Sequence, residues 1–140
     1  MVTNGHYMYD IAISYAGEDR TYAETLAAIL QHQGVKVFFD RYERATLWGK
    51  NLYTYLSELY QKKARYCIVF LSEHYAQSLW TNHEREAAQA RAFKENDAYI
   101  LPIRLDKTDI PGVLPTLAYL DWFSETPEGI AKLVLEKLGR

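Results

Sequence analysis

The residues best suited to chemistry in this sequence are a tryptophan and a glutamate four positions apart, Trp80 and Glu84. If a helix already runs there, residues at this spacing project from neighbouring points of one helical face. An aromatic surface beside a carboxylate suits a sugar or a nucleoside. The same segment, Thr81-Asn82-His83-Glu84, also fits the capping box T-x-x-E, in which the glutamate only satisfies a backbone donor at the start of a helix. Spacing alone favours the cap.

Other motifs with chemical meaning are incomplete. The glycines never form G-x-G-x-x-G, and Gly49-Lys50 lacks the remaining residues of a phosphate-binding P-loop. The run from His83 begins like a zinc-protease helix, but Ala87 stands where the second histidine would bind the metal. Cys67 lies within the strongest strand signal of the chain, so we expect a small buried residue rather than a nucleophile. We therefore expect no metal site.

Length and composition indicate one domain and exclude several classes of protein. The chain has 140 residues, of which 49% are hydrophobic and 24% charged, as is typical of a globular domain. We expect a single domain over residues 1–140, with its core at about 7–138. The net charge of −2 offers no basic surface for nucleic acid or anionic membranes. One cysteine, no signal-peptide run and no membrane span predict a cytoplasmic protein.

Short apolar runs alternate with amphipathic stretches along the chain, a pattern that predicts parallel strands connected by helices. Right-handed crossovers place helices on both faces of the sheet. We therefore expect an α/β fold, a flavodoxin-like three-layer α/β/α arrangement with a five-stranded parallel sheet in the order 2-1-3-4-5. In such a sheet a ligand binds at the carboxyl ends of the strands. The loops at that edge begin near Ser14, Asp40, Ser72, Asp106 and Asp121.

The expected strands are 9–14, 35–39, 66–71, 99–105 and 117–122. The third should be central, and Pro102 places the fourth near an edge because proline cannot donate to a sheet. Gly34 ends the first helix. A turn that contains Tyr75 and Trp80 precedes a helix over 82–94, and the sequence Thr-Pro-Glu at 126–128 opens the last helix. The buried stripe of that helix is expected to contain Ile130, Leu133, Val134 and Leu138.

Three segments resemble signature boxes of Toll/interleukin receptor (TIR) domains of the bacterial type. Residues 9–15, YDIAISY, resemble the first box, and the loop from Asp40 that ends in LWGK at 47–50 resembles the bacterial BB loop. Residues 78–84, SLWTNHE, are similar to the family's S-x-W-C-x-x-E segment. The resemblance spans about 9–123, with the elements in the same order.

The resemblance implies an enzyme that cleaves NAD⁺ between nicotinamide and ribose, giving ADP-ribose or a cyclic ADP-ribose isomer. NAD⁺ is then the substrate, and no cofactor is needed. The resemblance implies that Glu84 is catalytic. The substrate-binding residues that it implies are Ser14, Tyr15, Ala16, Asp40, Trp48, Lys50 and Trp80. For Tyr15 the alternative is packing against a helix, and for Trp80 it is anchoring its loop. The resemblance also implies a homo-oligomer through the 40–50 loop and a role in bacterial defence or signalling.

Two other functions stay open at this point. Thr81 replaces the family's cysteine and Trp122-Phe123 reverses its third box, departures that leave room for a non-catalytic module that binds other TIR domains. A nucleoside-processing transferase is a third alternative, because such enzymes share the fold type and also use a glutamate. Activity on free deoxynucleosides, with none on NAD⁺, would select it.

Overall fold

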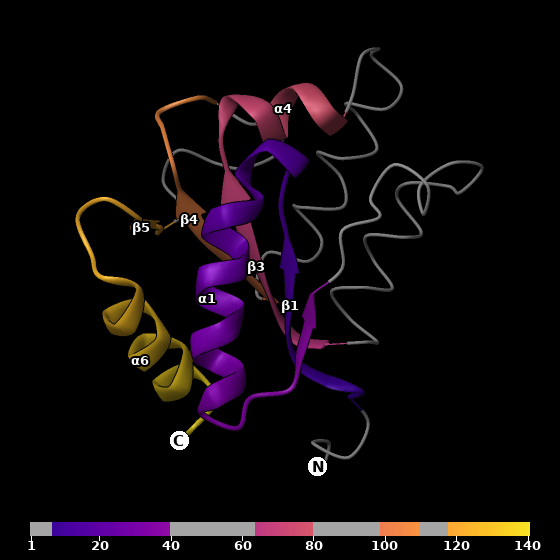
Figure 1. Cartoon of the computed structure of the whole chain (residues 1–140), viewed down its shortest axis with the longest axis vertical. Coiled ribbons are helices and arrows are strands. Elements are labelled where there is room, and N and C mark those ends of the chain that lie inside the picture. The colour runs from indigo at the N-terminus through magenta and orange to yellow at the C-terminus, as the bar shows by residue number, and fades with distance from the viewer. Residues whose placement is uncertain (1–6, 40–63, 80–98, 110–117) are drawn as a thin grey trace.

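The computed structural model describes residues 7–39, 64–79, 99–109 and 118–140 of the chain. These ranges contain five strands, three α-helices and one turn of 3-10 helix, arranged as Figure 1 shows. In chain order the elements are β1 (Tyr9–Ser14), η2 (Gly17–Asp19), α1 (Arg20–His32), β2 (Val37–Phe39), β3 (Ala64–Leu71), α4 (Glu73–Leu79), β4 (Ile100–Arg104), β5 (Leu120–Asp121) and α6 (Pro127–Lys137).

The five strands form one parallel sheet in the order β2-β1-β3-β4-β5, which confirms the order predicted from the sequence. The longest strand, β3, is central, also as predicted. Its register places Tyr66 beside Ile11 of β1 and Cys67 beside Ile100 of β4. The carboxyl ends of β1, β3 and β4 therefore reach the same edge of the sheet.

Side chains on both faces of the sheet are buried, which explains the continuous apolar runs in the sequence. Successive residues of β1 and β3 alternate between the faces. One face is covered by α1 and α6, which lie on the same side of the sheet in Figure 1. Its core includes Ile11, Ile13, Ile68 and Phe70 with Leu26, Leu30, Ile130 and Val134 of the helices. The opposite face buries Ala12, Cys67, Val69 and Leu71. Burial on both faces agrees with the expected three-layer architecture, and Cys67 is the small buried residue expected.

Two helix ends lie where the sequence predicts them, at Gly34 after α1 and at Thr126 before α6. Gly34, just past the end of α1, has a φ of +85°, a left-handed conformation that glycine adopts without steric cost. Thr126 precedes α6, and its side chain accepts a hydrogen bond from the backbone N–H of Gly129 at 3.0 Å. Pro127 occupies the first turn of α6, where its missing N–H costs nothing.

Pro102 lies in β4, one strand from the edge of the sheet, in agreement with the prediction. The carbonyl of Arg104 accepts a hydrogen bond from the amide of Trp122 at 3.0 Å, on the side of β5. The nitrogen of Pro102, two residues earlier, faces the same side because backbone groups alternate along a strand. Pairing with β5 begins only at Ile103, so the missing donor of Pro102 faces a position that β5 does not reach.

Some local predictions are wrong. Tyr75 lies in helix α4 where a turn is expected, because seven residues are too few to show an apolar stripe. Leu133 is 42% exposed rather than buried, and Ala131 faces the core instead. The strands β2 and β3 begin at Val37 and Ala64, two residues later and two residues earlier than predicted, and β5 is shorter than expected.

Candidate functional site

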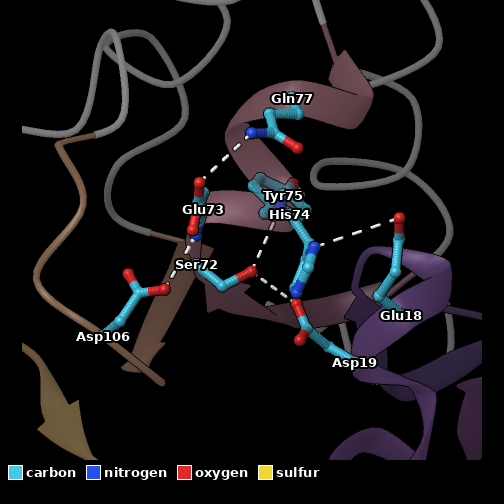
Figure 2. Close-up of polar contacts among 8 residues, drawn as sticks. All are labelled: Glu18, Asp19, Ser72, Glu73, His74, Tyr75, Gln77 and Asp106. Carbon is cyan, nitrogen blue, oxygen red and sulfur yellow. Dashed lines mark hydrogen bonds and ion pairs between the residues drawn. The ribbon is translucent and has the colours of Figure 1, made fainter.

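The carboxyl ends of β1 and β3 lie side by side at the edge that is uppermost in Figure 1. In open parallel sheets a ligand binds at this edge, where the connections of two neighbouring strands lead away in opposite directions. That place is between β1 and β3 here, because β2 flanks β1 on one side and β4 flanks β3 on the other. Residues of η2 and of the first turn of α4 meet there, as Figure 2 shows.

Asp19 and Ser72 form a buried hydrogen bond across this edge. Asp19 closes η2 and is 4% exposed, and Ser72 follows β3 and is 1% exposed. The hydroxyl of Ser72 donates to Oδ2 of Asp19 and accepts from the backbone N–H of Tyr75 at 3.0 Å (Figure 2). Ser72 thus caps the first turn of α4, as serine commonly does, while Asp19 holds the serine hydroxyl from the neighbouring loop.

Burial raises the pKa of Asp19 above its ordinary value, because desolvation penalises the carboxylate more than the neutral acid. The hydrogen bond from Ser72 and the charge of His74 act in the opposite direction. Two further carboxylates, Glu18 and Asp106, raise the pKa of Asp19 again. Burial and the two neighbouring carboxylates therefore outweigh the hydrogen bond from Ser72 and the charge of His74.

A second bond across the edge joins the hydroxyls of Ser14 and Tyr75, 2.8 Å apart. Ser14 is the last residue of β1, and Tyr75 is buried in the first turn of α4. Either hydroxyl can be the donor. A serine hydroxyl offers one donor and two acceptor positions, so Ser14 keeps the capacity to bind another polar group.

Asp106 holds the start of α4 from the side of β4. Its Oδ2 accepts from the backbone N–H of Glu73 at 2.9 Å, and its Oδ1 accepts from the backbone N–H of Thr108 at 2.9 Å. Burial alone would raise the pKa of Asp106, but these backbone hydrogen bonds, with the charge of His74, outweigh it and bring the pKa below its ordinary value. Side chains from three separate loops therefore fix the first turn of α4.

The residue types of a Ser-His-Asp triad occur here, but their geometry is not that of a triad. In a triad the histidine stands between the serine hydroxyl and the carboxylate. Here Ser72 donates directly to Asp19, and the imidazole Nδ1 of His74 lies 3.9 Å from a carboxylate oxygen of Glu18 (Figure 2). Because Ser72 is also buried, its hydroxyl serves as a structural contact and not as a nucleophile.

Three of the residues expected to bind substrate are part of this edge. Ser14 is half-buried and bonded to Tyr75. The side chains of Tyr15 and Ala16 are buried in the cores of opposite faces of the sheet. The cluster that contains Tyr15 also contains residues of α1 and α6. Substrate binding by the three residues stays a prediction.

The other expected site residues lie outside the described residues, and their roles also stay predictions. They are Glu84, Trp80, Asp40, Trp48 and Lys50. The structure adds Asp19 to this edge, which was not predicted, and it gives Tyr75, Ser72 and Asp106 hydrogen bonds that were not predicted either. A serine after a strand is a local signal for a helix cap. No local signal joins Ser72 to Asp19, since they are 53 positions apart.

Neither a metal cluster nor a membrane helix occurs in the part of the chain that the structure describes. No three His, Cys, Asp or Glu side chains there gather in a way that could hold a metal ion. In the same ranges, no helix has the length and apolar character needed to cross a membrane.

Comparison with curated proteins gives relatives that match most of the chain. It is 56% identical over 135 residues to a protein named 3' cyclic ADP-D-ribose synthase AaTIR from Aquimarina amphilecti, covering 96% of this chain and 41% of the relative. It is 34% identical over 104 residues to a protein named NAD(+) hydrolase TcpC from Escherichia coli, covering 74% of this chain and 33% of the relative. The chain thus spans less than half the length of these relatives.

Comparison with solved structures supports the fold independently. The structure of a metazoan TIR-STING receptor from C. gigas superposes with a TM-score of 0.59 at 20% identity, covering 96% of this chain and 42% of that chain. The family model described as TIR domain matches residues 11–134. Because that match takes in most of the sequence, the chain belongs to the TIR domain family.

Proposed function

We propose that this domain cleaves the bond between nicotinamide and ribose in NAD⁺. The observation that carries the proposal is the similarity to the Aquimarina relative, which is named for making a cyclic ADP-ribose and matches nearly the whole chain. The relative named as an NAD(+) hydrolase supports the same substrate. The proposal concerns the activity of this domain, since both relatives are much longer.

One carboxylate is sufficient for this chemistry. Most glycosidases need a second acid to protonate a poor leaving group. Nicotinamide in NAD⁺ is a pyridinium, so it takes the electron pair of the broken bond and leaves as a neutral molecule. The enzyme then has to stabilise the cation that develops on the ribose, which a fixed carboxylate does electrostatically. We assign this role to Glu84, the glutamate of the segment that resembles the family's S-x-W-C-x-x-E.

The products depend on what attacks the ribose carbon. Attack by water, with loss of one proton, gives ADP-ribose. Attack by an adenine nitrogen or a ribose hydroxyl of the same molecule, again with loss of one proton, gives a cyclic ADP-ribose isomer. The higher identity to the cyclic ADP-ribose synthase than to the hydrolase favours cyclisation.

Further parts of the proposal rest on the sequence and on the position of the edge between β1 and β3. The substrate is bound there by Ser14, Tyr15 and Ala16, with Trp80 and the loop residues Asp40, Trp48 and Lys50 completing the site. No cofactor takes part. The domain assembles with copies of itself through the 40–50 loop and acts in the cytoplasm, in bacterial defence or signalling.

Separation of the products of NAD⁺ tests the activity. Concentrated protein with a crowding agent should release nicotinamide, and chromatography of the second product distinguishes ADP-ribose from a cyclic isomer. Glu84→Gln removes the charge but keeps the size of the side chain, so we expect turnover to fall by at least about 100-fold. Glu86→Gln, two residues further along the chain and outside that segment, is the matched control and should keep wild-type turnover.

The possible outcomes distinguish the proposed functions. Equal turnover by wild type and Glu84→Gln would remove the glutamate from the mechanism. No nicotinamide release by any form, together with self-association in solution, would favour a non-catalytic TIR interaction module instead. Cleavage of deoxynucleosides with none of NAD⁺ would indicate a nucleoside-processing transferase.

A further inference from the structure

The first turn of α4 is held by more polar contacts than a helix of seven residues needs. Ser72 caps it, and Asp106 accepts from its first amide (Figure 2). The hydroxyl of Tyr75 is also hydrogen-bonded to that of Ser14. The chain continues directly from the end of α4 at Leu79 into the segment that contains Trp80 and Glu84. The orientation of α4 therefore sets where that segment starts.

Asp19 does not cap its own helix, α1, but forms a hydrogen bond with Ser72, which caps α4. It occupies the N-cap position of α1, where an aspartate commonly accepts a hydrogen bond from an amide of its own helix. The side chain of Asp19 makes no such bond. It is directed across the edge of the sheet to the hydroxyl of Ser72, in a different loop.

Burying the carboxylate of Asp19 at this edge of the sheet has a free-energy cost. A carboxylate that is 4% exposed loses most of its hydration, and other carboxylates, Glu18 and Asp106, lie close enough to oppose its charge. A residue that is costly to bury and that connects two loops at the proposed site is better explained by function than by stability.

We propose that Asp19 is a positioning residue for NAD⁺ cleavage: its hydrogen bond from Ser72 fixes the first turn of α4 and thereby the start of the segment that carries Glu84. The inference rests on the proposed function. Asp19 itself does not contact the reacting atoms. Loss of its bond lets α4 shift relative to β1, and displacement of a catalytic group by about 1 Å can reduce a rate by about 100-fold.

Steady-state kinetics of four variants test this role, with NAD⁺ as substrate and each protein assayed at a temperature where it is folded. Asp19→Ala and Ser72→Ala remove the bond, and kcat should fall on the order of 10- to 100-fold while KM stays within about threefold. Asp19→Asn keeps an acceptor for the serine hydroxyl, so kcat should recover to within about threefold of wild type.

Asp10→Ala is the matched structural control. Asp10 is at the opposite end of β1, and its Oδ2 accepts from the backbone N–H of Lys36 at 2.9 Å and from Arg140 at 3.1 Å. Removing this carboxylate should lower the melting temperature but leave kcat unchanged. If Asp19→Ala does not fold, Ser72→Ala and Asp19→Asn still decide the question through the same kcat comparison.

Each result has a definite meaning. Wild-type kcat in Ser72→Ala and in every folded Asp19 variant would show that the pair is only structural. An Asp19→Asn variant as slow as Asp19→Ala would show that the charge matters rather than the hydrogen bond, and would overturn the positioning role. If wild-type protein and Glu84→Gln both fail to release nicotinamide, the proposed function fails first, and this inference fails with it.

Discussion

Asp19 is a titratable side chain that is buried at the edge of the sheet, where its carboxyl group accepts the hydrogen bond from Ser72. Its pKa is raised mainly by burial, so the folded protein binds the Asp19 proton more tightly than the unfolded chain does. Between the ordinary aspartate pKa of 3.8 and the raised value, unfolding releases that proton. The free energy of unfolding contributed by Asp19 is therefore highest below this window and falls as the pH rises through it.

Asp19→Asn removes this pH dependence. We expect the stability of the variant relative to wild type to increase as the pH rises through the window and to level off above it. Denaturant unfolding of both proteins at a series of values from about pH 3 to about pH 7 measures the difference. Glu18, His74 and Asp106 face Asp19 in both proteins, so their own titration largely cancels.

Asp106→Asn provides a control of opposite sign. The pKa of Asp106 is lowered, so its contribution to stability is present above the ordinary aspartate pKa and is lost as the pH falls. The deficit of Asp106→Asn should therefore grow as the pH rises. Parallel stability curves for wild type and Asp19→Asn would contradict the raised pKa of Asp19.

At the scale of elements, α4 was the hardest part of the described fold to predict. The strands β1 and β3 can be predicted from the sequence because both faces of the sheet are buried, so most of their residues are apolar. Helix α6 can be predicted from its capping residue, Thr126, and from Pro127 in its first turn. The seven residues of α4 leave no periodic pattern, and the contacts that hold it come from Ser14, Asp19 and Asp106, far away in sequence.

The bond between Ser14 and Tyr75 joins β1 to α4, and a double-mutant cycle measures its strength. Tyr75→Phe, Ser14→Ala and the double variant should show a coupling energy of about 0.5–1.5 kcal/mol, the usual net value of a hydrogen bond. Chemical denaturation of the four proteins provides the free energies. Additive effects of the two substitutions would show that the 2.8 Å contact between the hydroxyls does not stabilise the fold.

At the scale of the whole molecule, the order of the strands can be predicted from the sequence, whereas the hydrogen bond between Asp19 and Ser72 cannot. The order of the strands follows from the alternation of strands and helices and from right-handed crossovers. The same order brings Ser14 and Ser72 to one edge, so the location of the site follows from topology. The pairing of Asp19 with Ser72 does not follow, because it depends on the angle at which two loops meet.

The proposed assembly makes a prediction about how the site is shared between copies. If the 40–50 loop of one copy completes the site that contains Glu84 in the next, Trp48→Ala and Glu84→Gln inactivate different components of one shared site. An equal mixture of the two inactive proteins should then regain activity, up to about a quarter of the sites if copies mix at random in a head-to-tail assembly. Nicotinamide release by the mixture, measured as the total concentration is raised, detects this. If each copy holds a complete site, the mixture should show only the sum of its parents at every concentration.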